Sequence, residues 1–119
     1  MMSKILVVDD DRSCAMILAR FLANAGYEVK AVMSGQDAVS LGPSFVPDLL
    51  VSDWLLQDGF DGVMVAKMFL EQSPTLRIIF ITGLPREHLE AKLGDIVGEI
   101  FEKPLDIEEL LKAVKRSLD

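Results

Sequence analysis

Three carboxylates follow the first apolar run of the chain. Lys4–Val8 is short, branched and almost wholly apolar, and Asp9, Asp10 and Asp11 come directly after it. Two carboxylates about 4 Å apart repel each other by about 4 kcal/mol at an effective dielectric constant of about 20. Such a cluster protonates, faces open water or binds a hard cation such as Mg²⁺ or Ca²⁺ through its oxygens. Our hypothesis is the third option, with a further carboxylate supplied from elsewhere in the chain.

Polar residues of complementary types end the later apolar runs. Asp53, Thr82 and Lys103 each stand where such a run finishes. A carboxylate can act as a nucleophile, a hydroxyl group can donate to a phosphoryl oxygen, and a lysine ammonium group can neutralise a phosphoryl group during transfer. Together with the acidic cluster, this set suits phosphoryl transfer to an aspartate.

The elements that must position these residues alternate along the chain. Short apolar runs predict five buried strands, at residues 4–8, 27–33, 48–53, 77–81 and 99–102. Capping and helical spacing predict five helices: one between Asp11 and Gly26, one from Ser34 to about Leu41, one over 62–72, a short one opened by Pro85, and one beginning at Asp106. This alternation implies right-handed crossovers and a parallel sheet with helices on both faces. It also implies a functional crevice at the carboxyl ends of the strands.

The apolar residues of three predicted helices are expected to face the core. They are Cys14, Ile17, Leu18, Phe21, Leu22 and Ala25 in the first helix, Met64, Val65, Met68 and Phe69 in the third, and Ile107, Leu110, Leu111, Val114 and Leu118 in the last. The third helix is apolar nearly all round. Deep packing against a neighbouring helix explains its remaining apolar residues, Val63 and Leu70, better than a partner surface does.

Composition restricts the class of protein. A chain of 119 residues fits a single domain over residues 1–119, and a net charge of -7 without any basic run argues against binding to nucleic acid or to an anionic membrane. One cysteine excludes an internal disulfide and a cysteine-based zinc site. The short apolar runs fit neither a signal peptide nor a membrane span. We therefore expect a cytoplasmic protein that does not contact the membrane.

In its ordered landmarks the sequence closely resembles the receiver domains of two-component response regulators, the CheY-like family. The matching landmarks are Leu6–Asp11, Asp53 at the end of the third strand, Asp61-Gly62 opening the third helix, Thr82-Gly83, and Lys103-Pro104. They run through nearly the whole chain, and the ordered set is far more specific than any one piece. The resemblance implies a flavodoxin-like (βα)5 three-layer sandwich with five parallel strands in the order 2-1-3-4-5.

The resemblance also assigns the acceptor and the metal ligands. It implies that Asp53 accepts a phosphoryl group from a phosphohistidine on a sensor histidine kinase or a histidine phosphotransfer protein. Asp10 and Asp53 would bind Mg²⁺ directly, Asp9 would bind it through water, and the backbone carbonyl of Leu55 would be a further ligand. The domain would then be a phosphorylated signalling module and not an enzyme, beyond self-catalysed phosphorylation and slow autodephosphorylation.

Two more landmarks would contact the phosphoryl group. Thr82 with Gly83 after the fourth strand, and Lys103 after the fifth, would meet the phosphoryl oxygens. In the family the bond corresponding to Lys103-Pro104 is usually cis, and we expect the cis isomer here even though only about 5% of X-Pro bonds in folded proteins adopt it.

The sequence departs from the family pattern in the loop after the acceptor. Gln57 replaces the usual proline, and Asp61-Gly62 falls one residue later than usual, so the loop is one residue longer. Two positions that tune hydrolysis in the family, often through polar side chains that orient water, are Leu55 and Leu84 here. Because a leucine neither aligns nor activates water, we expect slow dephosphorylation of Asp53.

The position of the family's switch aromatic is also changed. Ile100 occupies it, and Phe101 comes one residue later, which on a strand is the opposite face. Output would then use a different element, or the surface of the fourth and fifth helices, where an effector protein or a second copy of the chain could bind.

Four other interpretations remain open at this point. A phosphatase of the haloacid dehalogenase type needs a second aspartate two residues after the nucleophile, where this chain has Leu55. A nucleotide or flavin site needs a glycine-rich phosphate loop, whereas the first loop carries three acids. The chain could also be a docking receiver that is never phosphorylated. Finally, it could be a single-domain regulator, a phosphate-relaying shuttle, or the receiver of a longer regulator or hybrid kinase.

Overall fold

The computed structural model describes residues 2–119, which form five strands and five helices in strict alternation. The strands are β1 (Lys4–Val8), β2 (Glu28–Val32), β3 (Leu49–Asp53), β4 (Arg77–Thr82) and β5 (Glu99–Glu102). The helices are α1 (Arg12–Asn24), α2 (Gly35–Leu41), α3 (Gly62–Gln72), α4 (Arg86–Glu90) and α5 (Ile107–Leu118). Each predicted element is present, with ends that differ by a residue or two.

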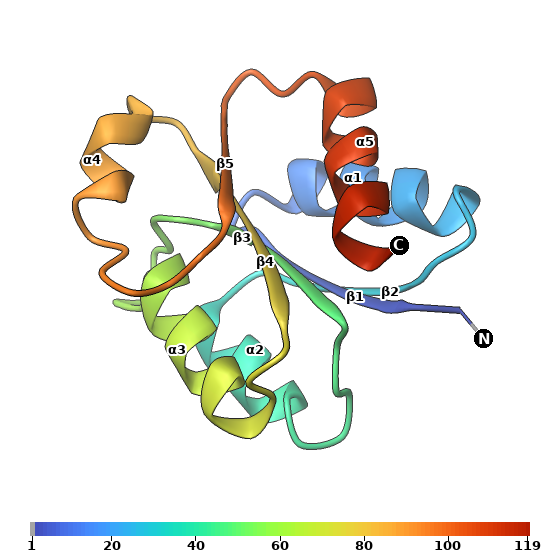
Figure 1. Cartoon of the computed structure of the whole chain (residues 1–119), viewed down its shortest axis with the longest axis horizontal. Helices are drawn as coiled ribbons and strands as arrows, with labels where there is room; N and C mark the ends of the chain where they lie inside the picture. Colours follow the sequence, from blue (N-terminus) through green and yellow to red (C-terminus); the bar gives the residue numbers. More distant parts are fainter. Residues whose placement is uncertain (1) are drawn as a thin grey trace.

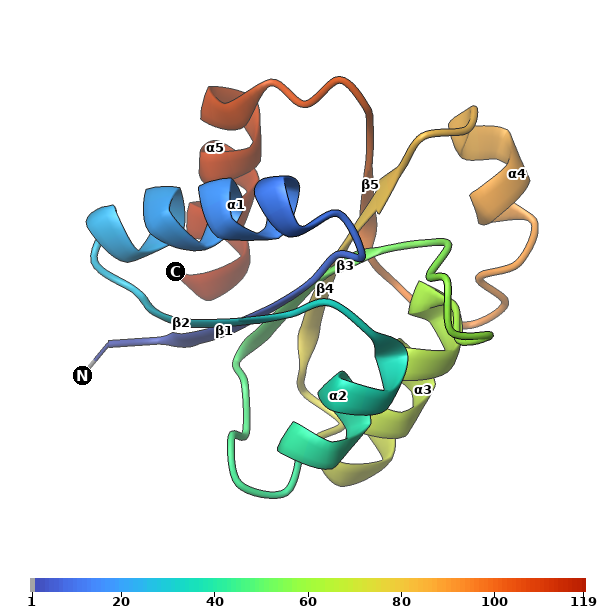
Figure 2. The ribbon, with the colours of Figure 1, turned by 180° about the vertical axis from the view of Figure 1, so that it is seen from behind.

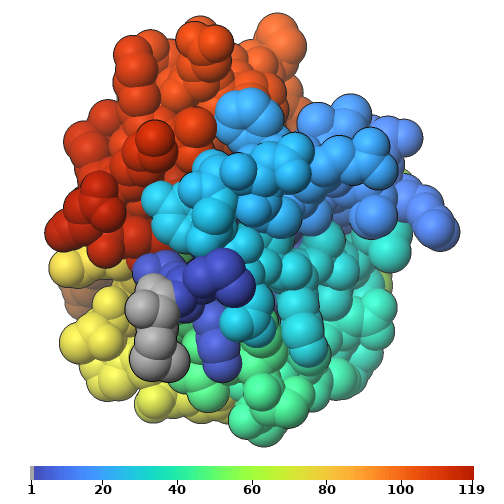
Figure 3. All heavy atoms as spheres, turned by 90° about the vertical axis from the view of Figure 1, so that its right-hand side faces the viewer, coloured from blue at the N-terminus to red at the C-terminus, as the bar shows by residue number. Residues whose placement is uncertain are grey.

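The strands form one parallel sheet in the order β2-β1-β3-β4-β5. Helices α1 and α5 cover one face of this sheet, and α2 and α3 cover the other (Figures 1 and 2). The space-filling view shows α5 lying directly against the α1 side of the molecule (Figure 3). The predicted three-layer α/β sandwich and its strand order are therefore confirmed.

Alternate residues of each strand pack on opposite faces of the sheet, as the period of a strand requires. In β1, Leu6 and Val8 belong to the core beneath α2 and α3, whereas Ile5 and Val7 belong to the core beneath α1 and α5. Because both faces are buried, these central strands read as continuous apolar runs and not as alternating ones.

Aspartate and serine caps begin the longer helices close to the strand ends. Asp11 accepts the Cys14 N–H, Ser34 accepts the Asp37 N–H, and Asp61 accepts the Met64 N–H. At α5, Asp106 accepts two N–H groups of the first turn. These caps satisfy N–H groups that have no acceptor within the helix.

The predicted inward faces of α1 and α3 are partly wrong. Ile17 is 61% exposed, and Met64 and Met68 on α3 are 44% and 40% exposed. The residues of α3 that are buried are Gly62, Val63, Val65, Ala66 and Phe69. A helix that is apolar nearly all round contains more apolar residues than its sheet-facing side can hold, so some of them, here Met64 and Met68, stay exposed. The predicted deep packing of Val63 is confirmed.

Across residues 2–119, no helix is long and apolar enough to cross a membrane.

Gly62 allows α3 to begin against the end of β3. Its N–H donates to the Trp54 carbonyl at 2.6 Å. A Cβ atom at this position would lie 2.5 Å from the carbonyl oxygen of Asp53 and 3.1 Å from Ser52 Oγ. Since the nearest atom belongs to the backbone beside Asp53, it cannot swing away as the end of a side chain could. The start of α3 is thus fixed directly against the backbone of Asp53.

We expect Gly62→Ala to lower the free energy of unfolding by about 2 kcal/mol, because overpacked sites of this kind force the backbone to shift. Urea denaturation followed by circular dichroism measures the change. Gly83→Ala is the matched control, since a Cβ atom at Gly83 meets no atom within 4 Å. Equal stability of the two variants would contradict the close-packing argument.

Candidate functional site

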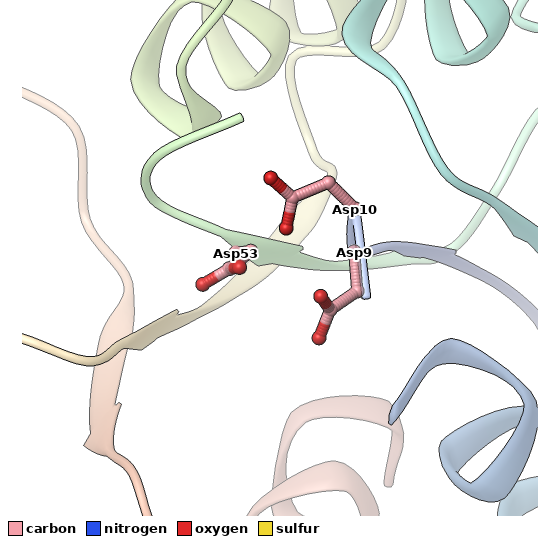
Figure 4. A group of neighbouring side chains, drawn as sticks. All are labelled: Asp9, Asp10 and Asp53. Atoms are coloured by element: carbon pink, nitrogen blue, oxygen red, sulfur yellow. The ribbon is translucent and has the colours of Figure 1, made fainter. Parts of the chain in front are cut away.

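Three aspartates meet at the carboxyl ends of β1 and β3. Asp9, Asp10 and Asp53 each offer a carboxylate oxygen, and these oxygens lie within 4.8 Å of one another. Val8 of β1 pairs with Ser52 of β3, so the next residues along the chain, Asp9 and Asp53, are neighbours. Figure 4 shows the three carboxylates gathered around the carboxyl ends of β1 and β3. The register of the sheet therefore creates the cluster that the sequence predicted.

Asp9 contributes an oxygen that is buried without a hydrogen bond. The residue is 1% exposed, and its Oδ1 accepts the Asp11 N–H at 2.9 Å. Among the described residues, its Oδ2 has no hydrogen-bond partner. An unsatisfied buried acceptor costs about 1–3 kcal/mol, and more when it is charged. A cation at this place would remove that cost.

Lys103 supplies the positive charge nearest to the cluster. Its Nζ lies 3.4 Å from Asp53 Oδ2 and 3.7 Å from Asp9 Oδ2. Its backbone N–H donates to the Thr82 carbonyl, and the Lys103-Pro104 bond is cis, the isomer expected from the sequence. Burial disfavours the ammonium form, yet the charges of Asp53 and Asp9 outweigh burial and raise the pKa of Lys103. Lys103 therefore stays cationic beside two carboxylates.

Asp53 is a buried acid with a perturbed pKa. It is 7% exposed, and its pKa is raised to about 6. Burial is the main cause and the negative charge of Asp9 is the second, while the charge of Lys103 acts in the opposite direction. One lysine thus offsets only part of the repulsion among three carboxylates.

The donor set fits a hard divalent cation. Mg²⁺ prefers oxygen ligands, and three carboxylate oxygens converge here. Asp9 Oδ2 accepts no hydrogen bond and lies 3.7 Å from Lys103 Nζ, and the pKa of Asp53 is raised; both indicate negative charge that Lys103 does not fully compensate. The residues present therefore fit the ion that the sequence suggested.

Thr82 lies at the end of β4, the strand next to β3, and is 1% exposed. Its hydroxyl accepts the Leu84 N–H at 3.0 Å and donates to the Leu84 carbonyl at 3.3 Å. It is therefore near the cluster along the sheet edge but is hydrogen-bonded to the loop that follows, which contains Gly83. Two exposed leucines, Leu55 and Leu84, flank this edge.

The position expected for a switch aromatic is an aliphatic core residue. Ile100 packs with Leu89 in the core beneath α2 and α3, whereas Phe101 packs on the face that α1 and α5 cover. The expected opposite orientation of these two neighbours is confirmed.

Cys14 is a neighbour of the site that the sequence reasoning placed only in the core. Burial and the adjoining carboxylate of Asp9 raise the pKa of its thiol to about 12, so it remains protonated. The sequence does contain a signal for this contact, because Cys14 lies in the first turn of α1, the helix that Asp11 caps. This turn directly follows the acidic cluster, which brings the Cys14 side chain close to Asp9.

Comparisons with known proteins agree with this geometry. The response regulator receiver domain family matches residues 5–115. The DNA-binding transcriptional regulator NtrC of Salmonella typhimurium is 32% identical over 115 residues, which are 94% of this chain and 24% of that protein. The regulatory protein PhoP of Bacillus subtilis is 31% identical over 121 residues, which are 98% of this chain and 50% of that protein. The chain thus spans about a quarter to a half of these curated relatives.

Solved structures that are similar to this chain include proteins of the same kind. A response regulator receiver protein from Sinorhizobium medicae superposes with a TM-score of 0.90 at 30% identity, covering 98% of this chain and 94% of that one. The chemotaxis protein CheY4 of Vibrio cholerae superposes with a TM-score of 0.84 at 29% identity, covering 98% and 99%.

The raised pKa of Asp53 predicts how stability changes with pH in the absence of metal. In the unfolded chain this carboxyl ionises near 3.8, and in the folded chain near 6. Between these values the folded state holds the extra proton, so the free energy of unfolding falls as the pH rises through this window. Asp53→Asn should abolish this fall and stabilise the protein at neutral pH by about 1 kcal/mol, allowing for solvent screening.

Thermal denaturation in EDTA at a series of pH values measures the effect. Asp95→Asn, in the exposed loop before β5, is the control and should follow the unmodified protein. If Asp53→Asn also followed it, the buried repulsion would not be the source of the pH dependence.

Proposed function

The chain belongs to the response regulator receiver domain family, and we propose that it carries a signal by accepting a phosphoryl group on Asp53. The donor would be a phosphohistidine of a sensor histidine kinase or of a histidine phosphotransfer protein. The observation that best supports this is the pairing of Asp53, nearly buried and with a raised pKa, with Lys103 at 3.4 Å. A buried carboxylate with a raised pKa, next to the ammonium group of Lys103, is suited to accepting a phosphoryl group and to balancing its negative charge.

The transfer step is a displacement at phosphorus. A carboxylate oxygen of Asp53 forms a bond to phosphorus while the bond from phosphorus to the imidazole nitrogen of the donor breaks. The bonding electron pair leaves with that nitrogen, which takes up a proton from water. Lys103 Nζ then pairs with a phosphoryl oxygen. Thr82 and the Gly83 N–H donate to others, and for this Thr82 must release Leu84.

The metal ligands would be those given by the resemblance. Asp10 and Asp53 would hold Mg²⁺ directly, Asp9 would hold it through water, and the carbonyl of Leu55 would complete the protein's share. The bound ion supplies positive charge against the carboxylates and the incoming phosphoryl group. The open Oδ2 of Asp9 supports this assignment.

We propose that output runs through the segment after β4, because Ile100 replaces an aromatic switch. Movement of Thr82 toward a phosphoryl oxygen would free Leu84 and shift the start of α4. There the Arg86 N–H donates to Glu102 Oε2 at 2.6 Å, and its guanidinium group donates to the Ile100 carbonyl. The surface of α4 and α5 would thereby change for an effector protein or a second copy of the chain.

The domain itself would bind no nucleic acid, given its net charge of -7. Its relatives are transcriptional regulators, which favours a cytoplasmic location. The same acceptor chemistry would serve a single-domain regulator, a phosphate-relaying shuttle, or the receiver of a longer regulator or hybrid kinase.

Incubation with acetyl phosphate and Mg²⁺, followed by intact-mass spectrometry, tests the proposal. We expect the mass of one phosphoryl group to be gained stoichiometrically, and to be lost with Asp53→Ala or with EDTA. Repeated turnover of the phosphodonor would indicate an aspartyl-phosphate phosphatase instead. No mass gain, from this donor or from a phosphorylated phosphotransfer protein, would leave a docking module as the function.

Leu55 and Leu84, 53% and 40% exposed, should make the phosphorylated form long-lived. Leu55→Asn combined with Leu84→Gln should speed the loss of the phosphoryl group by about tenfold or more, because polar side chains can orient the attacking water. The decay of the added mass after removal of the donor gives the rate. Leu55→Met with Leu84→Met keeps the edge apolar and should decay as slowly as the original chain; equal rates for both pairs would refute this explanation.

A further inference from the structure

The loop between β3 and α3, residues 54–61, is closed at its base. Leu55 pairs with Asp61 in an isolated antiparallel bridge, and the Gly62 N–H donates to the Trp54 carbonyl. The loop is one residue longer than the family pattern. Because Leu55 is paired with Asp61 on the other side of the loop, a contact that holds the tip of the loop restrains Leu55 as well.

The tip of this loop is held by α2, an element about 22 residues earlier in the chain. Asp58 accepts the Gly35 N–H at 3.4 Å on Oδ1 and the Gln36 N–H at 3.0 Å on Oδ2. Amides in the first turn of a helix have no acceptor within the helix, and this end attracts negative charge. Hydrogen bonds from Gln36 and Gly35 lower the pKa of Asp58, so the side chain is anionic at neutral pH.

Phe60 provides a second hold at the same place. A Cβ atom at Gly35 would lie 2.2 Å from Phe60 Cβ and 2.4 Å from its Cγ, so the ring occupies space that only glycine leaves free. Phe60 also packs against the core beneath α2 and α3. A polar contact and an apolar contact thus fasten one loop to the start of α2.

We propose that Asp58 is a positioning residue for the metal site: by tying the loop to α2, it holds the carbonyl of Leu55 where the ion bound by Asp10 and Asp53 can use it. This inference rests on the proposed function for the identity of the ion and its ligands. A longer loop gives up more conformational freedom when it is ordered. Without the tie, only a fraction of molecules would present the carbonyl, and the apparent affinity for Mg²⁺ falls by that fraction.

Two variants remove the hold by different means. Asp58→Ala deletes the acceptor oxygens, and Gly35→Ala expels the Phe60 ring. Each should weaken Mg²⁺ binding by about tenfold, the usual size for residues that orient metal ligands. Asp58→Asn keeps one acceptor oxygen and should recover most of the affinity. Gln57→Ala, an exposed neighbour in the same loop, is the matched control.

Mg²⁺ titration followed by Trp54 fluorescence measures the affinity, because this buried indole directly follows Asp53. Thermal denaturation in EDTA tests each variant for stability separately. Weaker binding by Asp58→Ala and Gly35→Ala, with affinity regained in Asp58→Asn and retained in Gln57→Ala, would support the proposal.

Two outcomes would overturn the inference in different ways. If the unmodified chain binds Mg²⁺ and both variants bind it equally well, Asp58 only stabilises the loop, and the acceptor function stands. If the unmodified chain shows no Mg²⁺ binding by fluorescence or by calorimetry, the metal assignment fails, and the role of Asp58 fails with it.

Discussion

The mutual repulsion of carboxylates buried at the ends of two parallel strands is the constraint that organises this molecule. Asp9 and Asp53 are almost fully removed from water, and within residues 2–119 Lys103 is the basic residue that forms ion pairs with both of them. The register of β1 and β3 places Asp9 and Asp53 side by side, and the close packing of Gly62 against the Asp53 backbone keeps Asp53 in that position. Keeping this arrangement lowers the stability of the folded state in the absence of a compensating cation. The chemistry proposed for Asp53 follows from that imbalance.

Much of this could be inferred from the sequence because it depends on local patterns. Apolar runs bounded by polar residues identify buried strands, and Asp11, Ser34 and Asp61 identify helix starts by chemistry that acts within three residues. Once strands and helices alternate, a parallel sheet with helices on both faces follows, and the residues that end the strands fall on one edge of it. The strand order came from the resemblance to receiver domains. The cluster was thus predictable without any knowledge of side-chain packing.

The remaining features depend on contacts between distant segments or on competition for the same space. Spacing alone could not show that Met64 lies outside while Ala66 lies inside, because α3 offers apolar residues on almost every side. The extra residue in the loop after β3 was visible, but its attachment to α2 through Asp58 was not. From the sequence, Asp58 is an ordinary loop aspartate, because the Gly35 and Gln36 N–H groups come near it only in the folded chain.

The shortness of α4 has a consequence for how this surface can change. The helix has five residues, Leu89 is its one buried side chain, and Pro85 at its start makes no side-chain cap. An isolated helix of this length is unstable in water, so α4 persists only while it is docked. Displacing Leu89 from the core would unfold the helix and would not merely tilt it, so local unfolding of this face needs little free energy.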